Sequence, residues 1–212
     1  MLSPSFADTA DRVFCVPLCW RVGAHRGHYG PVKALVQVHA VTADRWPDLV
    51  GLFERPGPRG GTPMPATCWC MWWRQRTGDE IKNREAMRSL VRGGHEPGLL
   101  AYADGVAVGW VSAGRREGFG QLMRSPQYKP LDDDSNVFAI VCLYVDPRWK
   151  TSGVGSTLLD AAIEWARERG ATAIEAYPNL TPDFMGRLEA FERRGFSRTR
   201  VAGTRSIVRL AL

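Results

Sequence analysis

The chain has 212 residues, of which 44% are hydrophobic and 24% charged, and its formal net charge is +6. This length favours one domain with a full core, and the composition is that of a soluble globular protein. No apolar run approaches the roughly 18 residues of a membrane helix, so a membrane span is not expected. The modest positive excess suits an anionic cofactor, and without a basic run it does not indicate a nucleic acid partner.

The chain has five cysteines, an odd number without the spacing of a disulfide framework. This favours reduced thiols in a cytoplasmic protein. Asp8 and Asp11 lie before the first apolar patch, which argues against a secretory signal. Cys15 and Cys19 have two histidines nearby, but their spacing matches no known zinc motif, so no metal site is predicted.

Residues 1–35 show no clear period, and we expect an extension that is partly ordered against a domain spanning 36–212. An upstream false start is the alternative. Residues 35–41 alternate and predict a first, edge strand. A helix is expected over 45–53, capped by Thr42 or Asp44.

The stretch from Pro56 to Pro65 is too rich in proline and glycine for regular structure and predicts a loop. The following segment, 68–74, contains three tryptophans, Trp69, Trp72 and Trp73. One interpretation is an aromatic core segment or strand. The other is the wall of a ligand pocket, with Arg74 contacting an acid group of the ligand.

A helix that begins at Asp79 or Asn83 should end at Gly93-Gly94. Asp104-Gly105 lies between two apolar runs and predicts a hairpin over 98–113. A polar connection follows over 115–130. The acidic run 132–134 is either a solvated turn or a patch that attracts a cationic amine.

Phe138 to Val145 is an unbroken apolar run and predicts a buried strand, which Asp146-Pro147 ends. The glycine-bearing turn 150–155 then leads into an amphipathic helix over 154–169. Backbone N–H groups at such a turn, together with the helix dipole, form a cradle for phosphate or pyrophosphate. The spacing fits neither a P-loop nor a Rossmann turn.

The remaining chain predicts a strand over 171–177 and a helix from Thr181-Pro182 to Arg194. A final hairpin is expected over 196–212, with its turn at 202–204.

The segment from Leu143 to Gly155 resembles the acetyl-CoA motif of GNAT-type N-acetyltransferases, [QR]-x-x-G-x-[GA] after a strand, with Lys150 in place of Gln or Arg. A second family motif, similar to Y-E-K-x-G-F, is matched by Phe191-Glu-Arg-Arg-Gly-Phe196. The resemblance covers roughly residues 36–212. It implies an α/β (α+β) fold with a mixed, mostly antiparallel sheet of six to seven strands and about four helices, in which the central strand and the next one splay apart.

The resemblance also implies a site for acetyl-CoA as co-substrate and no metal. The pantetheine arm should pair with the backbone of Leu143 and Val145 like an added strand. The N–H groups of the turn should bind the pyrophosphate. The binding residues expected after the strand are Lys150, Thr151, Ser152, Gly153, Val154, Gly155 and Ser156. Trp72, Trp73 and Arg74 are expected on the side of the acceptor.

The positions that correspond to the family's catalytic residues do not hold the same residue types in this chain. Phe191 stands where many members have the tyrosine that protonates the thiolate, and the base glutamate of histone-type members falls at about Ala139. Asn179 lies only near the family's asparagine position. By location, the candidates for acid and base are Glu175, Tyr144 and Glu117.

The leading hypothesis is an N-acetyltransferase that moves acetyl from acetyl-CoA to a primary amine of a small molecule or protein in a ternary complex. The alternative is a catalytically silent acyl-CoA-binding sensor or interaction module, and a different nucleotide ligand on a similar turn is a third option. The aromatic segment favours a small-molecule acceptor. A homodimer is one option for the oligomeric state.

Overall fold

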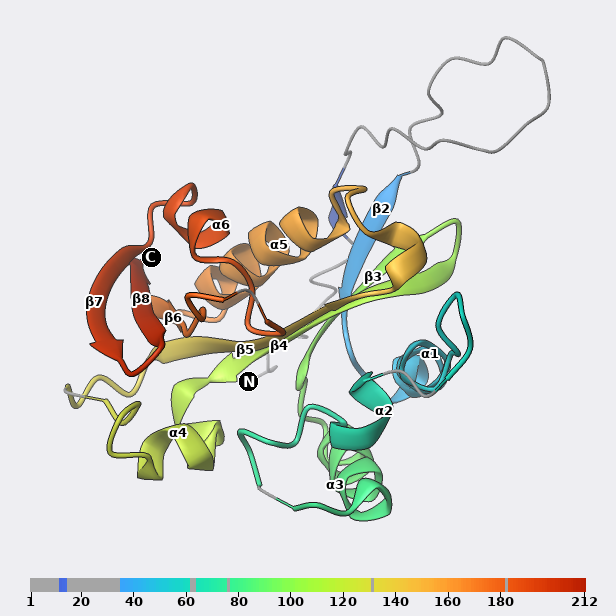
Figure 1. The fold of residues 1–212 in the computed structure, drawn as a ribbon, viewed down its shortest axis with the longest axis horizontal. Helices are drawn as coiled ribbons and strands as arrows, with labels where there is room; N and C mark the ends of the chain where they lie inside the picture. Colours follow the sequence, from blue (N-terminus) through green and yellow to red (C-terminus); the bar gives the residue numbers. More distant parts are fainter. Residues whose placement is uncertain (1–11, 15–34, 62–63, 76, 131, 182) are drawn as a thin grey trace, which may run out of the picture.

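The computed structural model describes residues 12–14, 35–61, 64–75, 77–130, 132–181 and 183–212. These residues form a single eight-stranded sheet in the order β1-β2-β3-β4-β5-β6-β8-β7. Figure 1 shows helices α5 and α6 on one face of this sheet and helices α1 to α4 on the other. The mixed, mostly antiparallel fold expected from the resemblance is therefore confirmed, with one strand more than expected.

The additional strand is β1 (Arg12–Phe14), which pairs antiparallel with β2 (Val36–Ala40). The prediction that residues 35–41 form an edge strand is therefore wrong, because β2 lies between β1 and β3 (Gly98–Ala103). The expected hairpin joins β3 to β4 (Val106–Arg115). Asp104 and Gly105 both have positive φ at its turn, as a tight hairpin turn requires.

Helices α1, α2 and α3 cover the face of the sheet that points down in Figure 1. The 3-10 helix η1 (Ala43–Arg45) leads into α1 (Trp46–Phe53), and α2 (Met64–Cys68) precedes the tryptophan segment. Helix α3 (Glu80–Arg92) begins at Asp79, whose carboxylate accepts a hydrogen bond from the Lys82 N–H at 3.0 Å. The predicted loop over 56–65 thus ends earlier, because Pro65 lies in the first turn of α2, where a proline needs no N–H partner.

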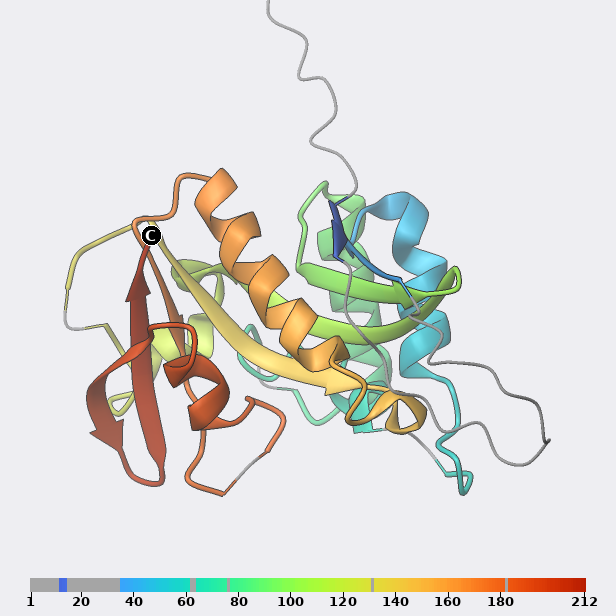
Figure 2. The same ribbon diagram turned by 90° about the horizontal axis from the view of Figure 1, so that it is seen from above.

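The 3-10 helix η2 (Arg116–Gly118) and α4 (Gly120–Arg124) lie in the connection between β4 and β5 (Val137–Val145). After β5, the 3-10 helix η3 (Pro147–Trp149) leads to α5 (Val154–Glu168), which returns to β6 (Ala173–Ala176). Strands β5 and β6 are parallel, and every other neighbouring pair is antiparallel. Figure 2 shows α5 lying across the strands that precede it.

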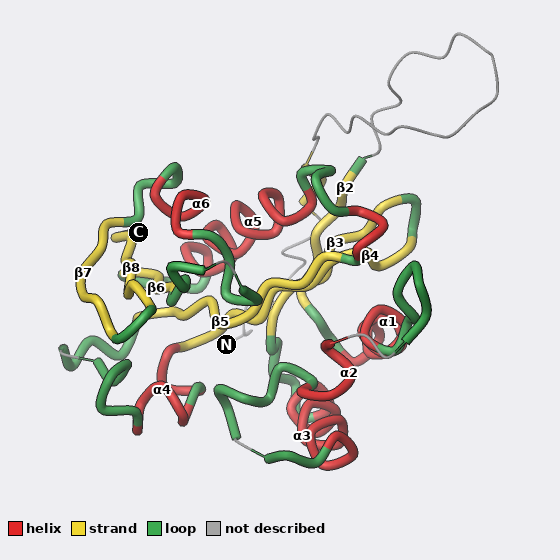
Figure 3. The backbone as a smooth tube through the Cα atoms, in the orientation of Figure 1, coloured by secondary structure: helices red, strands yellow, loops and turns green. Residues whose placement is uncertain are grey.

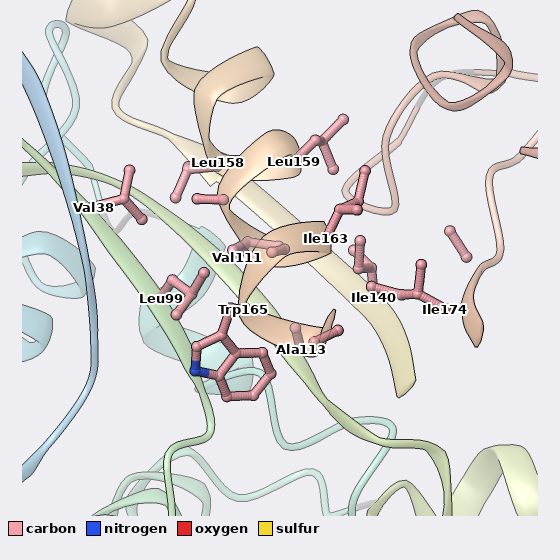
Figure 4. Close-up of a cluster of buried hydrophobic side chains, with 14 of the residues drawn as sticks. Val38, Leu99, Val111, Ala113, Ile140, Leu158, Leu159, Ile163, Trp165 and Ile174 are labelled. Carbon is pink, nitrogen blue, oxygen red and sulfur yellow. The ribbon is translucent and has the colours of Figure 1, made fainter. Parts of the chain in front are cut away.

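The apolar face of α5 packs on the sheet. Leu158, Ala162 and Ala166 are fully buried and join residues of β3, β4 and β5 in one core cluster. Figure 4 shows Leu158, Ile163 and Trp165 of α5 facing Leu99, Val111 and Ile140 of the sheet. Burial of these side chains fixes the position of the turn that precedes α5.

The C-terminal part departs from the prediction at one point. Helix α6 (Leu188–Glu192) has one and a half turns and does not begin at residue 181. The chain instead makes a turn over 183–186, where the Met185 N–H donates to Asp183 Oδ1 at 2.9 Å and Gly186 has φ +87°. Residue 182 lies outside the described residues. The final hairpin is formed by β7 (Ser197–Ala202) and β8 (Arg205–Ala211), and β8 inserts beside β6.

Candidate active site

Asp146 ends β5 and fixes the turn that follows. Its carboxylate is buried, accepts a hydrogen bond from the Arg148 N–H at 2.9 Å, and forms ion pairs with Arg55 at 3.2 Å and Arg148 at 3.1 Å. Burial tends to raise the pKa of Asp146, but the hydrogen bonds from Arg148 and Arg55 outweigh burial and lower it. Because Arg55 follows α1, this ionised group ties the turn to the opposite face of the sheet.

The N-terminus of α5 presents a row of backbone donors. Gly153 precedes the helix with φ +88°, a conformation that glycine adopts at little cost, and its carbonyl accepts the first helical bond from Thr157 at 3.0 Å. Within the described residues, the N–H groups of Gly153, Val154 and Gly155 donate to no protein acceptor. A helix start with free N–H groups and a positive dipole end attracts an anion.

The side chains of this turn divide into exposed and buried ones. Lys150, Thr151 and Ser156 are exposed, and the Lys150 side chain can reach a ligand, whereas the Thr151 hydroxyl donates to the Lys150 carbonyl at 2.5 Å. The Ser152 hydroxyl is buried and donates to the Trp149 carbonyl at 2.5 Å, and Val154 is part of the core. Of the predicted binding residues, Val154 and Ser152 can therefore serve a ligand only through their backbone.

Arg194 is a cation beside the cradle that sequence reasoning did not select. Its Nη2 donates to the Ser156 hydroxyl at 2.6 Å and to the Ser156 carbonyl at 3.0 Å, and its Nε pairs with Asp160 at 2.6 Å. Arg194 belongs to the second motif, Phe191 to Phe196. Its position in that motif is the sequence feature that could have indicated a role near the site. Its guanidinium group thus lies at the start of α5, where the Asp160 carboxylate pairs with it through two hydrogen bonds.

Strands β5 and β6 separate beside this cradle. They pair from Val137 and Ala173 to Ile140 and Ala176, whereas β5 stays paired with β4 as far as Val145. The ladder with β4 has a bulge at Val141, because Ser112 faces Cys142 and Ala113 faces Ile140. A bulge bends its strand and re-aims the side chains that follow it. The splay expected from the resemblance is thus present.

Part of the strand edge in this opening is already occupied. The Leu143 N–H donates to the Phe184 carbonyl at 2.5 Å, so the 183–186 turn lies against the edge where a pantetheine arm was expected. Figure 3 shows the loop between β6 and α6 lying beside the end of β5. The side chains of Leu143 and Val145 pack on the core that includes α5. An added strand at Leu143 therefore requires that this turn move away.

A cavity of about 460 Å³ lies on the opposite face of β5. Its aromatic lining consists of Trp72, Trp73, Tyr128 and Phe184. Trp72 is 43% exposed and Trp73 is 8% exposed, whereas Trp69 is buried and stacks on Trp46 with a ring-centroid distance of 5.6 Å. Two of the three tryptophans thus border a cavity and the third belongs to the core. We call this space the tryptophan cavity.

The remaining lining of the tryptophan cavity includes three free thiols, those of Cys68, Cys70 and Cys142. Trp110 Nε1 donates to Cys70 Sγ at 3.1 Å. The hydrogen bond with Cys70 and then burial raise the pKa of the Cys68 thiol, and the hydrogen bond with Cys142 raises that of Cys70. Cys68 and Cys70 are therefore neutral at physiological pH and act as small apolar groups.

Arg74 lies outside the tryptophan cavity. Its guanidinium group lies 4.2 Å from the Phe119 ring centroid and donates to the Pro97 carbonyl at 3.2 Å. Burial lowers the pKa of Arg74 to about 10, which leaves the group charged at neutral pH. These contacts give Arg74 a packing role at the end of β4.

Glu175 is held by two arginines. Its Oε1 pairs with Arg116 at 3.0 Å and with Arg209 at 3.1 Å, and the Tyr177 hydroxyl donates to its Oε2 at 2.9 Å. Glu175 borders a second cavity, of about 110 Å³, which shares Tyr128 with the tryptophan cavity. These contacts use both carboxylate oxygens of Glu175.

Among the described residues, neither of the other two catalytic candidates forms a hydrogen bond with Glu175. Tyr144 is half-buried on the same face of β5 as Cys142, and burial, followed by the charge of Asp146, raises the pKa of its phenol. Tyr144 is therefore protonated at neutral pH and can donate a proton. Glu117 is exposed in η2 and lines neither described cavity. Of the three candidates, only Glu175 lines a described cavity.

The sheet thus opens between two parallel strands, with free amide groups where the next helix begins, as the resemblance to GNAT-type N-acetyltransferases implies. The acetyltransferase (GNAT) family model matches residues 64–196. The chain therefore belongs to the GNAT acetyltransferase family and is an acyltransferase.

Comparison with solved structures extends this likeness to most of the chain. The GNAT domain of S. lividans PAT is 18% identical, with a TM-score of 0.55, over 85% of this chain and 92% of that one. The Drosophila melanogaster polyamine N-acetyltransferase is 14% identical, with a TM-score of 0.54, over 84% and 100%. PaiA N-acetyltransferase from Thermoplasma acidophilum, solved with coenzyme A, is 14% identical, with a TM-score of 0.51, over 84% and 99%. No curated protein matches the sequence.

Among the described residues, no helix is long and apolar enough to cross a bilayer. The same part of the chain contains no group of three or more His, Cys, Asp or Glu side chains that could hold a metal ion.

Proposed function

We propose that the protein is an N-acetyltransferase that transfers acetyl from acetyl-CoA directly to a primary amine in a ternary complex. The observation that carries this proposal is the set of free N–H groups at Gly153, Val154 and Gly155, beside the opening between β5 and β6. The domain that performs the reaction is proposed to span residues 36–212, with 1–35 as an extension. The free thiols at Cys68, Cys70 and Cys142 support a reducing compartment such as the cytoplasm.

The residues at the cradle fit the chemistry of coenzyme A. The free N–H groups of Gly153, Val154 and Gly155 can donate to pyrophosphate oxygens, and exposed Lys150 adds a cation. The pantetheine arm is proposed to pair with β5 at Leu143 and Val145 after the 183–186 turn is displaced.

The reaction requires a neutral amine beside the thioester carbonyl. The amine nitrogen forms a bond to the acetyl carbon, the carbon–sulfur bond breaks, the amine loses a proton and the thiolate gains one. Tyr144 is the proposed proton donor, because its phenol is protonated and it lies on β5 next to Leu143. Glu175 and Glu117 remain weaker candidates, since two arginines hold Glu175 and Glu117 is exposed. Proximity and orientation provide the remaining rate acceleration.

A silent acyl-CoA-binding module is the second candidate function. It is favoured by the Leu143 N–H that already has a protein acceptor, and by Phe191, which cannot donate the proton that the family tyrosine donates. A module of this kind would bind coenzyme A and transfer nothing.

One experiment separates the two candidates. The purified full chain is incubated with acetyl-CoA and a panel of primary amines, and free thiol is measured against a blank without protein. Thiol release that depends on the amine supports the transferase. A melting temperature that rises with coenzyme A, without amine-dependent thiol release from any amine, contradicts the transferase and supports the module.

A further inference from the structure

We infer that the acceptor is a primary amine carried on an aromatic or similarly bulky apolar body, and that this body binds in the tryptophan cavity. The inference rests on the proposed function, since it names the class of amine that the transferase acts on. It separates apolar arylalkylamines from polyamines and amino sugars, which are equally good nucleophiles in water.

The tryptophan cavity has the size of a small-molecule site. Its volume is about 460 Å³, within the range of roughly 300–1,000 Å³ that is usual for ligand pockets. A fused or single aromatic ring with a short amine side chain fits in such a volume. A folded protein segment with several side chains does not.

Its walls favour a flat apolar guest. Trp73 and Tyr128 meet edge to face with centroids 5.5 Å apart, and Trp72 adds an indole ring that remains 43% exposed. Aromatic rings gain about 0.5–1.5 kcal/mol per well-placed ring pair beyond the burial of area. The exposed part of the Trp72 ring can be covered by an aromatic body that binds in the cavity.

The charges of the lining oppose a polycation. Among the described lining residues none is acidic, and Arg205 is the single cation. Arg205 is already paired, with Asp183 at 2.6 Å and with the Tyr177 carbonyl at 3.1 Å. A polyamine would lose water from several ammonium groups there and find no anion to compensate, which is costly.

The apolar lining of the tryptophan cavity also favours the neutral, nucleophilic form of the acceptor amine. An apolar wall disfavours the charged form of an amine and lowers its pKa. The thiols of Cys68 and Cys70 have raised pKa values, so they supply no anion that would stabilise an ammonium group. The acceptor can therefore lose its proton without a side-chain base, which agrees with Glu175 being held between two arginines.

The tryptophan cavity also adjoins the strand edge where the thioester is proposed to bind. Cys142 lines the cavity and is the residue before Leu143 on β5. Phe184 lines the cavity as well, while its carbonyl contacts the Leu143 N–H. An amine that projects from the cavity past Phe184 therefore reaches the proposed position of the acetyl group.

The test measures binding and turnover separately on the full chain. Binding of tryptamine, 2-phenylethylamine, spermidine and an aminoglycoside is measured by calorimetry, with and without coenzyme A. Turnover of the same amines is measured as thiol release from acetyl-CoA. We expect the two arylalkylamines to have the highest kcat/KM of the panel.

Trp72→Ala should raise the KM for tryptamine by about 10-fold or more, because a contact with a large aromatic body is lost, while the Kd for coenzyme A stays unchanged. Trp72→Phe keeps a ring and should recover part of this loss. Ile81→Ala, which truncates an apolar side chain that is 76% exposed on α3, is the matched control and should change neither value.

Turnover that favours spermidine or the aminoglycoside overturns the inference and leaves the transferase standing. Tryptamine binding that disappears in Trp72→Ala, together with no turnover of any amine, supports the cavity assignment and removes the transferase. Failure of both arylalkylamines to bind, or binding that Trp72→Ala leaves unchanged, overturns the inference directly.

Discussion

Gly109 determines how closely α5 approaches the sheet. It lies on β4 opposite Val145, and a Cβ at its position would lie 2.8 Å from Val154 Cγ1 and 2.9 Å from Leu158 Cδ1. Both contacts are shorter than packed carbon atoms allow, and both partners are fully buried. The absence of a side chain at Gly109 therefore lets the first turn of α5, and with it the cradle, sit directly on the strand.

Gly109→Ala should reduce the free energy of unfolding by about 1–3 kcal/mol, because a methyl group enters a filled core. Chemical denaturation measures the change. Gly51→Ala is the matched control, because nothing lies within 4 Å of a Cβ at Gly51 in α1. That substitution should stabilise the protein by about 0.5–1 kcal/mol. Equal effects of the two variants would contradict the packing role of Gly109.

Single residues of the site were predicted from sequence to different degrees. The tryptophans of segment 68–74 indicated a pocket wall, and Trp72 and Trp73 border the tryptophan cavity. Phe184 and Arg205 were missed, because they come from distant segments and carry no local pattern. Arg74 was assigned to the acceptor from its proximity to the tryptophans in sequence, but its side chain turns towards Phe119.

Helix α5 acts as one unit in anion binding, because its free N–H groups and its dipole meet at Gly153. Gly153→Asp places a carboxylate at this end and should weaken coenzyme A binding by about 10-fold or more through charge repulsion. Gly153→Asn has nearly the same shape and shares the cost of the positive φ, which Asn tolerates better than most residues.

Calorimetry measures the Kd for coenzyme A in Gly153→Asp and in Gly153→Asn. The ratio of these two Kd values isolates the effect of the added negative charge. Gly153→Asp and Gly153→Asn with equal affinity for coenzyme A would show that no anion binds at the start of α5.

The 183–186 turn is a second element with a functional consequence. Asp183 holds it through the ion pair with Arg205 and by accepting from the Met185 N–H. Asp183→Asn removes the ionic part of this attachment, so the turn should leave Leu143 at a lower cost. We expect acetyl-CoA to bind about 3- to 10-fold more tightly, in line with the loss of one partly buried ion pair.

Calorimetry gives the affinity, and hydrogen exchange at the Leu143 amide reports the release of the turn. Glu192→Gln, which removes an exposed ion pair with Arg198, is the control and should change neither quantity. An acetyl-CoA affinity that stays constant or falls in Asp183→Asn would mean that the turn does not compete with the pantetheine arm.

Elements with strong apolar patterns were predicted within one or two residues. The run 138–145 became β5 and the periodic segment 154–169 became α5, since burial on the sheet follows directly from those patterns. The helix over 181–194 was wrong at its start, because Thr181-Pro182 has the residue types of a helix start but the chain turns at Gly186. The bulge at Val141 has no signature in an unbroken apolar run.

At the scale of the whole molecule, ion pairs connect distant parts of the chain. Asp132 pairs with Arg116 at 2.7 Å and with Arg209 at 2.8 Å, and both arginines also hold Glu175. These contacts join η2, β6 and β8 with the segment before β5. The hydrogen bond from Arg116 lowers the pKa of Asp132 to about 2.

A lowered pKa means that the ionised carboxylate stabilises the fold above the ordinary value of 3.8, and that this contribution is lost as the pH falls towards about 2. Asp132→Asn should therefore melt at a lower temperature than the parent at pH 6, with a difference that shrinks between pH 4 and pH 2. Melting curves across this range measure it. Asp133→Asn, at the adjacent exposed carboxylate, is the control. A constant difference at all pH values would rule out this source of acid sensitivity.

The global topology followed from the family resemblance more than from any local pattern. The mixed, mostly antiparallel sheet and the splay between β5 and β6 came with the resemblance and are confirmed. The position of β2 as an inner strand was missed, because its partner Arg12–Phe14 lies in a region without periodicity. Pairing between strands depends on partners far along the chain, which a single sequence does not reveal.

Phe184 belongs to both halves of the proposed site, through its carbonyl at Leu143 and through its ring in the tryptophan cavity. Any displacement of this residue by one substrate reshapes the space offered to the other. The two binding equilibria are then thermodynamically linked, and by reciprocity the factor by which the thioester alters the amine's affinity equals the factor by which the amine alters the thioester's. The Phe184 carbonyl contacts the proposed thioester site, and the Phe184 ring lines the proposed amine site. This one residue would thus couple the binding of the two co-substrates.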